Sequence, residues 1–555
     1  MTLRDSVAAY VRPGDDIHVV CSHTRWTPAA TEVVRQWWGR DPGFTLTMLS
    51  LSSLGTLFFR GGLVERVVTG YSGDVFPNFT PNPIFGDAYL SGEVEVEHWS
   101  FLAFQQRLEA AARGVPAMVT ASIAGSDMAA NRGFTTVPTP FGELGLVAAH
   151  APDVALVHGA IADREGNVAF HPPMLEGVWG ALAAKRGSIV TVERVVDDIR
   201  PWAHLVQLPA HRVLSVTLCP MGAHPGGLYG RFTPAEPYGE DVDFWSSVRD
   251  ASRGDHFDEW IREWVLDVAD HDAYIDKLGP QRQAMLRRRA EVGSWRDDEA
   301  DHPVDETSPP NDWERAAVFG ARVLADRICD LGADAALAGA GVANLATWLA
   351  VRQARERGSK CVLTAELGLW GYQPTPADPF VFNHRAFPSS TMLADSSEVL
   401  GVIMAGPATT SVACLGAAIV DVEGNIDSTI IPGRAFLVGS GGGNDVASTA
   451  DEVVVMTTLT SRRTVGKVPY VTSPGRNVSH LVCDLGVFRK GDHGRFVLVA
   501  VAPGEGSVAE RIDGIARLCG WELELDGDVT ELDPVTDAEV LALRRWDPQG
   551  YFLRG

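Results

Sequence analysis

The sequence predicts an α/β fold made of two homologous domains, each built around an open, mainly parallel sheet. Short apolar runs such as Ile17–Val20, Val154–Val157 and Ile189–Val192 have the length and composition of buried parallel strands. Helical stretches such as Phe101–Arg113 lie between such runs. This alternation indicates βαβ units and therefore a parallel sheet. A repeated motif, and an acidic segment between two such blocks, indicate that the fold occurs twice.

The repeated motif is a nine-residue segment found once in each block. Gly159–Asn167 reads GAIADREGN and Ala417–Asn425 reads AAIVDVEGN, with six identical positions. Asp-x-Glu-Gly-Asn suits a turn, because Gly adopts positive φ and the Asp and Asn side chains bond the local backbone. A recurrent turn type is one explanation. Each copy follows an apolar strand and precedes another strand about 25 residues later, so we favour two homologous halves.

The first domain is predicted to span residues 1–289 and to end in a helical extension. In that extension Trp245, Trp260 and Trp264 recur at helical spacing among many charges. Residues 290–312 are acidic and have little apolar surface to bury, which predicts an exposed linker. The second domain, residues 313–555, begins with a predicted helix at Trp313–Asp330 and a strand at Ala335–Leu337. Two large halves explain the 555 residues better than three or four domains of average size.

Composition and charge exclude several classes of protein. The net charge of −24 argues against binding nucleic acid through bulk electrostatics, although a local basic patch could still hold a small anion. The seven cysteines are scattered and form no CxxC pair, so we expect neither a disulfide framework nor a metal site. We find no apolar run of the roughly 18 residues that a membrane span needs. The first residues lack the apolar core of a signal peptide. We therefore expect a soluble, cytoplasmic protein without a membrane partner.

Glu366 is the first candidate for chemistry in the second half. The apolar run CVLTA leads directly into Glu366, and Gly368 follows. The carboxyl ends of parallel strands line the active-site crevice of α/β sheets, so a carboxylate there is a candidate nucleophile or base. The alternative is a glutamate at the end of a strand that only bonds a neighbouring turn.

Glycine-rich turns supply candidate backbone donors. Gly441, Gly442, Gly443 and Asn444 follow an apolar strand and precede a helical stretch, an arrangement that can bind an anion or oxyanion. The spacing is neither that of a P-loop nor that of the dinucleotide fingerprint. A merely tight turn is the alternative. A second turn of this kind contains Gly339 and Gly341.

Charged and polar loops complete the set of candidates. In the second half, Arg462, Arg463 and Lys467 form a basic cluster that either meets phosphates or is simply solvated. In the first half, His23, Arg25 and Ser72 lie in polar loops after strands. Taken singly, such loops are more typical of structural turns. A Ser–His–Asp hydrolase is not indicated, because the G-x-S-x-G elbow is missing.

Read together, these elements resemble the family I CoA-transferases. The run Leu415–Gly475 contains GAAIVDVEGNIDST, FLVGSGGGNDVAS and RRTVGKVPYVTSPG in the order found in the β chain of glutaconate CoA-transferase. Glu366 matches the position of that family's nucleophilic glutamate. The first half is similar to the α chain in the segments Leu63–Gly73, Leu108–Ala112, Gly125–Asp127, Asp163–Asn167 and Val192–Arg194.

The first half is also similar to a steroid-ring-opening CoA thioester hydrolase of the same fold. The catalytic glutamate of that hydrolase would fall near Phe101 of this chain, whereas the glutamate of the transferases is present as Glu366. One departure from the transferase pattern is Cys21-Ser-His-Thr, where the family usually has a glycine-rich loop.

The resemblance implies α-like and β-like halves of the CoA-transferase (NagB/RpiA-like) fold, fused in one chain. It implies transfer of CoA between an acyl-CoA and a carboxylic acid through a glutamyl-CoA thioester on Glu366, with CoA as substrate and no metal. It assigns the oxyanion and CoA contacts to Gly339, Gly341, Gly441, Gly442, Gly443 and Asn444. Phosphate contacts go to Arg462, Arg463 and Lys467, and an acid pocket to His23, Arg25 and Ser72.

The resemblance also makes a homo-oligomer, a dimer of fused units, the expected assembly. The aromatic residues Trp26, Tyr71, Phe76 and Trp99 suggest a bulky or apolar acyl group, or ordinary core. Two other functions stay open on the sequence. One is hydrolysis, C–C cleavage or decarboxylation of a CoA thioester, and the other is acyl-CoA binding without catalysis.

Overall fold

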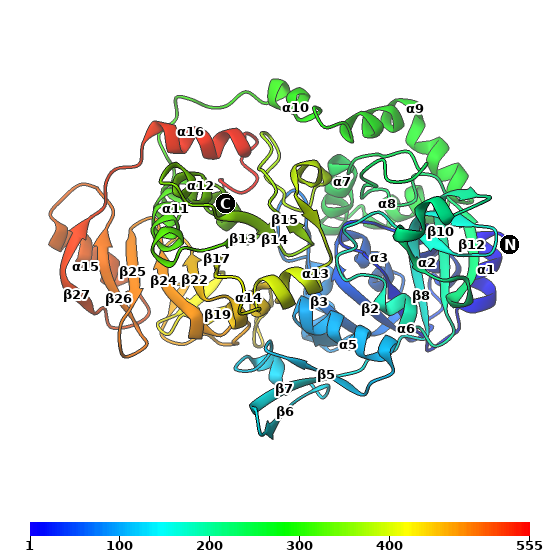
Figure 1. Ribbon diagram of the computed structural model, residues 1–555, viewed down its shortest axis with the longest axis horizontal. Coiled ribbons are helices and arrows are strands. Elements are labelled where there is room, and N and C mark those ends of the chain that lie inside the picture. The colour runs from blue at the N-terminus through cyan, green and yellow to red at the C-terminus, as the bar shows by residue number, and fades with distance from the viewer. Residues whose placement is uncertain (555) are drawn as a thin grey trace.

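The computed structural model contains two large mixed sheets that lie side by side, each flanked by helices (Figure 1). It describes residues 1–554, and the side chain of His384 lies outside that description. The first half of the chain, blue to green, forms one side of the molecule, and the second half, green to red, forms the other. This confirms the predicted α/β class with two mainly parallel sheets. The domain boundaries at residues 289 and 313 stay a prediction.

The first sheet has a parallel body with a short antiparallel margin. Its parallel strands follow the spatial order β4 (Glu95–His98), β3 (Val64–Ser72), β2 (Phe44–Leu51), β1 (Asp16–Val19), β8 (Val154–Asp163), β10 (Ser188–Val196) and β12 (Val213–Leu218). Two short antiparallel strands, β9 (Val168–Ala169) and β11 (Val206–Leu208), extend it beside β8. The apolar runs predicted at Ile17, Val154 and Ile189 are buried strands of this body.

The second sheet has a parallel body between two margins that contain antiparallel pairs. Its body runs β14 (Val362–Ala365), β13 (Ala335–Ala338), β17 (Ser411–Gly416), β22 (Glu452–Met456) and β24 (Val478–Val482). One margin consists of β15 (Leu369–Trp370) and β16 (Met392–Leu393). The other contains β25 (Gly486–Lys490) and β26 (Phe496–Val501), which pair antiparallel, and β27 (Leu525–Glu531), which pairs in parallel with β26.

Smaller sheets lie beside these two. One combines β18 (Ile419–Asp421), β19 (Ile426–Asp427) and β23 (Thr464–Val465), and another pairs β20 (Ile430–Ile431) with β21 (Ala435–Phe436). A third, made of β5 (Ala117–Thr120), β6 (Phe134–Thr139) and β7 (Gly142–Ala148), projects from the lower edge in Figure 1.

The repeated motif forms the same turn in both halves. The Asp163 carboxylate accepts hydrogen bonds from the Gly166 and Asn167 N–H groups, both at 2.8 Å, and the Asn167 amide donates back to it at 2.8 Å. Asp421 accepts from the Asn425 N–H at 3.0 Å, and the Asn425 amide donates back at 3.1 Å. The turns follow β8 and β18, which continues from β17, and β8 and β17 each pair with the first strand of their half. The shared turn and strand neighbours support the interpretation of two homologous halves.

Helices cover both sheets, and their ends follow local signals. The helices of the first half are α1 (Leu3–Tyr10), α2 (Pro28–Trp37), α3 (Thr56–Arg60), α4 (Pro83–Ser91), α5 (Phe101–Arg113) and α6 (Trp179–Ala183). Those of the second are α11 (Asp312–Leu331), α12 (Val342–Glu356), α13 (Ser396–Glu398), α14 (Gly443–Thr449), α15 (Val508–Leu518) and α16 (Asp537–Trp546). Helix α5 has the predicted bounds, because Ser100 caps its first turn and Gly114 ends it in the left-handed conformation.

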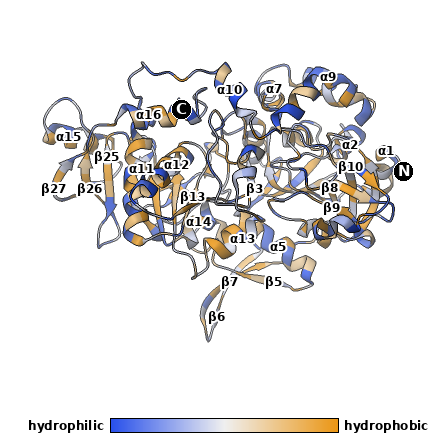
Figure 2. Ribbon diagram, turned by 45° about the horizontal axis from the view of Figure 1, so that its top comes forward, coloured by the Kyte–Doolittle hydropathy of each residue, from blue (hydrophilic) through white to orange (hydrophobic). Residues whose placement is uncertain are grey.

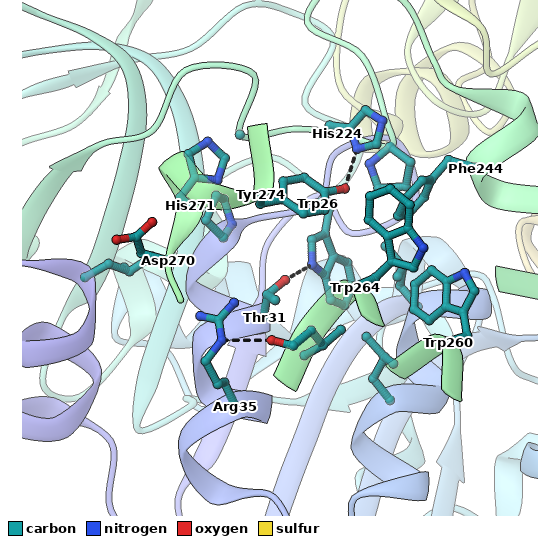
Figure 3. A pocket seen from close by; sticks show the side chains of 17 residues that line it. Trp26, Thr31, Arg35, His224, Phe244, Trp260, Trp264, Asp270, His271 and Tyr274 are labelled. Carbon is teal, nitrogen blue, oxygen red and sulfur yellow. Dashed lines mark hydrogen bonds between the residues drawn. The ribbon is translucent and has the colours of Figure 1, made fainter. Parts of the chain in front are cut away.

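A helical extension packs on the first half through aromatic side chains. It contains α7 (Val242–Arg253), α8 (Phe257–Ile261) and α9 (His271–Arg289). Figure 3 shows Phe244, Trp260, Trp264 and Tyr274 around a small cavity that faces Trp26 of the core. The tryptophans at helical spacing therefore belong to a helical extension that packs on the first half, as predicted.

The acidic linker is more ordered than its composition predicts. Residues of the linker form α10 (Trp295–Asp301), and the segment crosses the top of the molecule in Figure 1. The buried Arg385 pairs with Asp298, and the Arg544 guanidinium donates to the backbone carbonyls of Asp305 (2.8 Å) and Ser308 (3.0 Å). These partners come from distant parts of the chain, so local composition carries no sign of them.

The core lies within and between the layers. Figure 2 colours the central strands mainly orange, the hydrophobic end of the scale, and the surrounding helices in both colours. Among the described residues, no helix is both long and apolar enough to span a bilayer.

Candidate active site between the two halves

Glu366 stands at the carboxyl end of β14, in the tight turn that joins it to β15. The two strands pair antiparallel through Ala365 and Leu369, and the Gly368 N–H donates to the Ala365 carbonyl at 3.1 Å. Gly368 has φ +119°, and a Cβ there would lie 1.9 Å from the Ala394 carbonyl oxygen. The turn therefore requires glycine two residues after Glu366, as in the Glu-x-Gly pattern of the sequence.

Glu366 lines a cavity of about 250 Å³ to which both halves contribute. The first half supplies His23, Tyr71, Phe79 and Phe101. Around Glu366 the second half supplies Leu337, Gly339, Ala340, Phe382, Leu415, Gly416, Ala418, Ile426, Ser428, Val438, Gly439, Ser440, Gly441, Gly442, Gly443, Val446 and Ser473. The structure thus brings together six of the residues predicted from sequence: His23, Glu366, Gly339, Gly441, Gly442 and Gly443.

The glycine loop approaches the Glu366 carboxylate through Gly442. The Gly442 N–H donates a hydrogen bond to Glu366, and a Cβ on Gly442 would lie 2.0 Å from Oε2. The neighbouring N–H groups are used elsewhere: Gly441 donates to the Gly70 carbonyl at 2.9 Å and Gly443 to the Ser440 carbonyl at 3.0 Å. Of these three predicted donors, Gly442 is the one directed at the carboxylate.

The surroundings of Glu366 favour its protonated form. Burial raises the pKa of Glu366 to about 7, the carboxylate of Asp445 adds to the increase, and the Gly442 N–H opposes it. Asp445 is itself buried, and burial raises its pKa to about 6. Its carboxylate accepts the Leu102 N–H at 3.0 Å, at the first turn of α5. Asp445 therefore joins the two halves and also acts on the titration of Glu366.

His23 is the titratable group on the first-half side of the cavity. Its Nδ1 lies 2.9 Å from the Ser50 hydroxyl, and its buried Nε2 has no hydrogen-bond partner among the described residues. Burial lowers the pKa of His23 to about 4, so the ring is neutral at pH 7. The ring meets Phe382 edge-on, with centroids 4.4 Å apart.

Three residues predicted for binding make structural contacts. The Arg25 guanidinium is buried and donates to the backbone carbonyls of His171 (2.5 Å) and Pro173 (3.2 Å). The Ser72 hydroxyl lies 3.0 Å from the Tyr89 hydroxyl. The Asn444 side chain accepts the Ile123 N–H and donates to the Thr472 carbonyl, both at 2.8 Å. These contacts hold loops in place, and the assigned binding roles stay predictions.

The remaining predicted residues lie at the second-half end. Gly341 precedes α12 and caps it, next to Ala340 of the cavity wall. Arg463 donates to the Ala417 carbonyl at 3.4 Å and lies over the Trp313 ring at 5.2 Å. Ala417 stands between the cavity residues Gly416 and Ala418. Arg462 and Lys467 are exposed. Arg463 therefore lies next to this part of the cavity wall.

The sequence did not single out Asp445, Phe79, Phe382 or Glu176. Asp445 had a signal, because it directly follows the glycine motif, whereas the other three come from loops without a recognisable pattern. Glu176 is buried, and its carboxylate accepts the N–H of Cys21 at 2.6 Å. Cys21 lies two residues before His23. Burial raises its pKa to about 8. In the described part of the chain, no group of three or more His, Cys, Asp or Glu residues is arranged to hold a metal ion.

Comparisons with known proteins give matches over most of the chain. A family model described as coenzyme A transferase matches residues 1–216 and 323–497. The A-type chain of glutaconate CoA-transferase from Acidaminococcus fermentans is 30% identical over 314 residues, which cover 52% of this chain and 94% of that protein.

A B-type chain matches as well. The B-type chain of 3-oxoadipate CoA-transferase from Pseudomonas knackmussii is 25% identical over 203 residues, which cover 33% of this chain and 76% of that protein. Among solved structures, an acyl-CoA transferase from Escherichia coli O157:H7, in a thioester complex with CoA, superimposes with a TM-score of 0.66. It is 16% identical, and the match covers 96% of this chain and 94% of that one, which shows a shared fold over almost the whole length.

Proposed function

Because this chain belongs to the coenzyme A transferase family, we propose that it moves CoA between an acyl-CoA and a carboxylic acid through a glutamyl-CoA thioester on Glu366. The observation that carries the proposal is the placement of Glu366. Its carboxylate stands at the carboxyl end of a parallel strand, in a cavity between the halves, with the Gly442 N–H directed at it. A solved acyl-CoA transferase of the same fold, captured as a thioester complex with CoA, supports the covalent route.

The proposed reaction proceeds through two attacks. A Glu366 oxygen attacks the thioester carbonyl of the acyl-CoA, CoA leaves as a thiolate, and a mixed anhydride remains. The thiolate then attacks the glutamyl carbonyl of the anhydride, and the first acid leaves as a carboxylate. A second carboxylate reverses both steps and departs as the new acyl-CoA. A carboxylate is the required side chain, since both its anhydride and its thioester remain reactive.

The same neighbours serve each step. The Gly442 N–H is the backbone donor for the oxyanion that forms at the glutamyl carbonyl, and such donors typically contribute about 10²–10³ in rate. The buried walls limit the access of water, which would otherwise hydrolyse the anhydride. Arg463, with its sequence neighbours Arg462 and Lys467, is the candidate for the CoA phosphates, because Arg463 contacts Ala417 beside the cavity wall.

One observation favours transfer over hydrolysis. The similar steroid-ring hydrolase would place its catalytic glutamate near Phe101. Phe101 lines this cavity as an apolar side chain, while the carboxylate of the transferase position is present at Glu366. Glutaconate and 3-oxoadipate, after which the two relatives are named, are both dicarboxylates, and we do not assign them to this chain.

Intact-mass analysis tests the proposal. Incubating the purified protein with an acyl-CoA and no acceptor acid should add the mass of CoA less one water, located on the Glu366 peptide. The Glu366→Gln variant is the matched control and should carry no adduct. Release of free CoA from the wild-type protein without any adduct would contradict transfer and indicate hydrolysis.

A further inference from the structure

The first-half end of the active-site cavity is walled by aromatic side chains from separate parts of the chain. Tyr71 and Phe79 come from the end of β3 and the loop after it, Phe101 begins α5, and Phe382 comes from the second half. The rings touch one another: Tyr71 and Phe79 have centroids 6.1 Å apart, and Phe79 and Phe382 have centroids 5.6 Å apart. Phe79 also stacks on Phe552, near the C-terminus, at 6.3 Å. Tyr71, Phe79 and Phe382 therefore form a continuous aromatic wall at this end, and Phe101 also lines the cavity.

The polar atoms of this wall are largely paired within the protein. The Tyr71 hydroxyl donates to the Asp74 carbonyl at 2.8 Å, and the Ser428 hydroxyl donates to the Gly439 carbonyl at 3.0 Å. His23 Nε2 is the exception, because it is buried, unpartnered among the described residues and carried by a cavity-lining ring. A bound acyl group therefore finds the neutral His23 ring at this wall, and elsewhere in the cavity the neutral hydroxyls of Ser440 and Ser473, besides Glu366 and the glycine loop.

The wall provides no counter-charge for a second carboxylate. Of the residues described around the cavity, none is a lysine or an arginine. Arg25 is close in sequence to His23, but its guanidinium already donates to two backbone carbonyls and to the Met174 sulfur at 2.7 Å. An ionised carboxylate moved from water into such surroundings would lose its hydration without gaining an ion pair.

We propose that this cavity selects acyl groups that are apolar beyond the thioester carbonyl, such as branched or aromatic monocarboxylic acyl chains, and excludes dicarboxylic ones. The inference rests on the proposed function, because it assigns the acyl group to the site around Glu366. Phe79 is the specificity-determining residue that is easiest to change, since its ring is half-buried and forms the middle of the wall.

The first experiment compares substrates on the wild-type protein. Values of kcat/KM for isovaleryl-CoA and phenylacetyl-CoA should exceed those for succinyl-CoA and glutaryl-CoA by at least about 100-fold, because an unpaired buried charge is costly. Equal values for isovaleryl-CoA and succinyl-CoA would overturn the proposal.

The second experiment changes the wall. Phe79→Lys introduces a cation and should lower the ratio of kcat/KM for isovaleryl-CoA to kcat/KM for succinyl-CoA by at least about 10-fold. The neutral variant Phe79→Met, of similar length, should keep this ratio within about 3-fold of the wild-type value. If both variants lower this ratio equally, the missing charge of the wall does not determine which acyl group is accepted, and the proposal fails. Should Phe79→Lys not fold, the wild-type comparison still decides.

A binding measurement separates this inference from the reaction. In Glu366→Gln, which lacks the proposed nucleophile, the Kd of isovaleryl-CoA should be at least about 10-fold lower than that of succinyl-CoA. If no acyl-CoA gives turnover or an adduct, the proposed reaction fails while the Kd order still tests the pocket. Equal Kd values would reject the pocket assignment even if the transfer reaction were observed.

Discussion

The second strands of the two halves, β2 and β14, both pair in parallel with the first strand of their half, but they end differently. Ile17 of β1 pairs with Leu46 of β2 and with Val154 of β8. The corresponding strand in the second half is β13, where Ala336 pairs with Leu363 of β14 and with Val412 of β17.

The repeated turn shows which residues of the two sheets are equivalent. Val154 and Val412 each lie nine residues before the aspartate of their turn, Asp163 or Asp421. Leu46 therefore corresponds to Leu363 in the paired ladders. Three residues further along the chain in each half, Leu49 of the first half corresponds to Glu366 of the second.

The difference between Leu49 and Glu366 depends on where the strand ends. Strand β2 continues to Leu51, and Leu49 is fully buried in the core. Strand β14 ends at Ala365, and the turn closed by Gly368 puts Glu366 into the cavity. One scaffold therefore yields a packing position in one half and a candidate nucleophile in the other.

The largest expected effect is the difference between alanine substitutions at these two equivalent positions, Glu366 and Leu49. Glu366→Ala should lower kcat by at least about 10³-fold without lowering stability, because it removes the proposed nucleophile and also a partly buried acid. Leu49→Ala should instead cost about 2–5 kcal/mol of stability and leave kcat of the folded protein within a few-fold. Steady-state kinetics and thermal unfolding of both variants make the comparison. Full activity in Glu366→Ala would reject the nucleophile.

The glycine loop is expected to show the next largest effect. Gly442→Ala places a Cβ 2.0 Å from Oε2 of Glu366, too close for both atoms to stay in place, and should reduce kcat by about 10²–10³-fold. Gly443→Ala is the matched control: its Cβ would have an ordinary contact of 3.5 Å with the Ser473 hydroxyl, and its φ is not positive. It should change kcat by less than about 3-fold. Similar losses in both variants would mean that the loop as a whole, and not Gly442, is required.

The pH dependence of kcat/KM should reflect the titration of Glu366. Since burial raises its pKa to about 7 and the nucleophile is the carboxylate, kcat/KM should fall by about tenfold per pH unit below 7 and level off above it. His23, whose pKa burial lowers to about 4, should add no step between pH 5 and 9. Rates of adduct formation across this range provide the measurement. A flat profile from pH 5.5 to 8.5 would argue against a titrating carboxylate.

The smallest expected effect concerns the repeated turn, of which each half has one copy. The side-chain oxygen (Oδ1) of Asn167 accepts the Ala210 N–H at 3.1 Å, and Oδ1 of Asn425 accepts the Gly475 N–H at 2.8 Å. Asn167→Ala and Asn425→Ala each remove such bonds and should each lower stability by about 1–2 kcal/mol, to a similar extent. Thermal unfolding of the two variants compares them. A loss in only one variant would show that the two turns do not contribute equally to stability.

Much of the fold followed from local patterns. The bounds of α5 follow from Ser100 and Gly114, and both repeated turns follow from residues within five positions. Glu366 was identified because a short apolar strand, a glutamate and a glycine stand in close succession. Such signals are readable because the interactions behind them act over a few residues.

Other parts of the site depend on residues that are distant in sequence. The carboxylate of Asp445 meets the N–H of Leu102 across 343 positions, and the rings of His23 and Phe382 touch across the two halves. The order within the linker has the same origin, because Arg385 and Arg544 reach it from the second half. No local pattern encodes such partners.

The sequence by itself determined several buried strands, the helices α5 and α11, the two repeated turns and the position of the candidate nucleophile, since backbone preference and hydrophobic periodicity are properties of short segments. The tertiary structure decided which strand-end side chains share a cavity and which only hold loops in place. It also decided the raised pKa of Glu366 and the apolar wall beside it. Burial and electrostatic interactions depend on neighbours in space, and here those neighbours come from both halves of the chain.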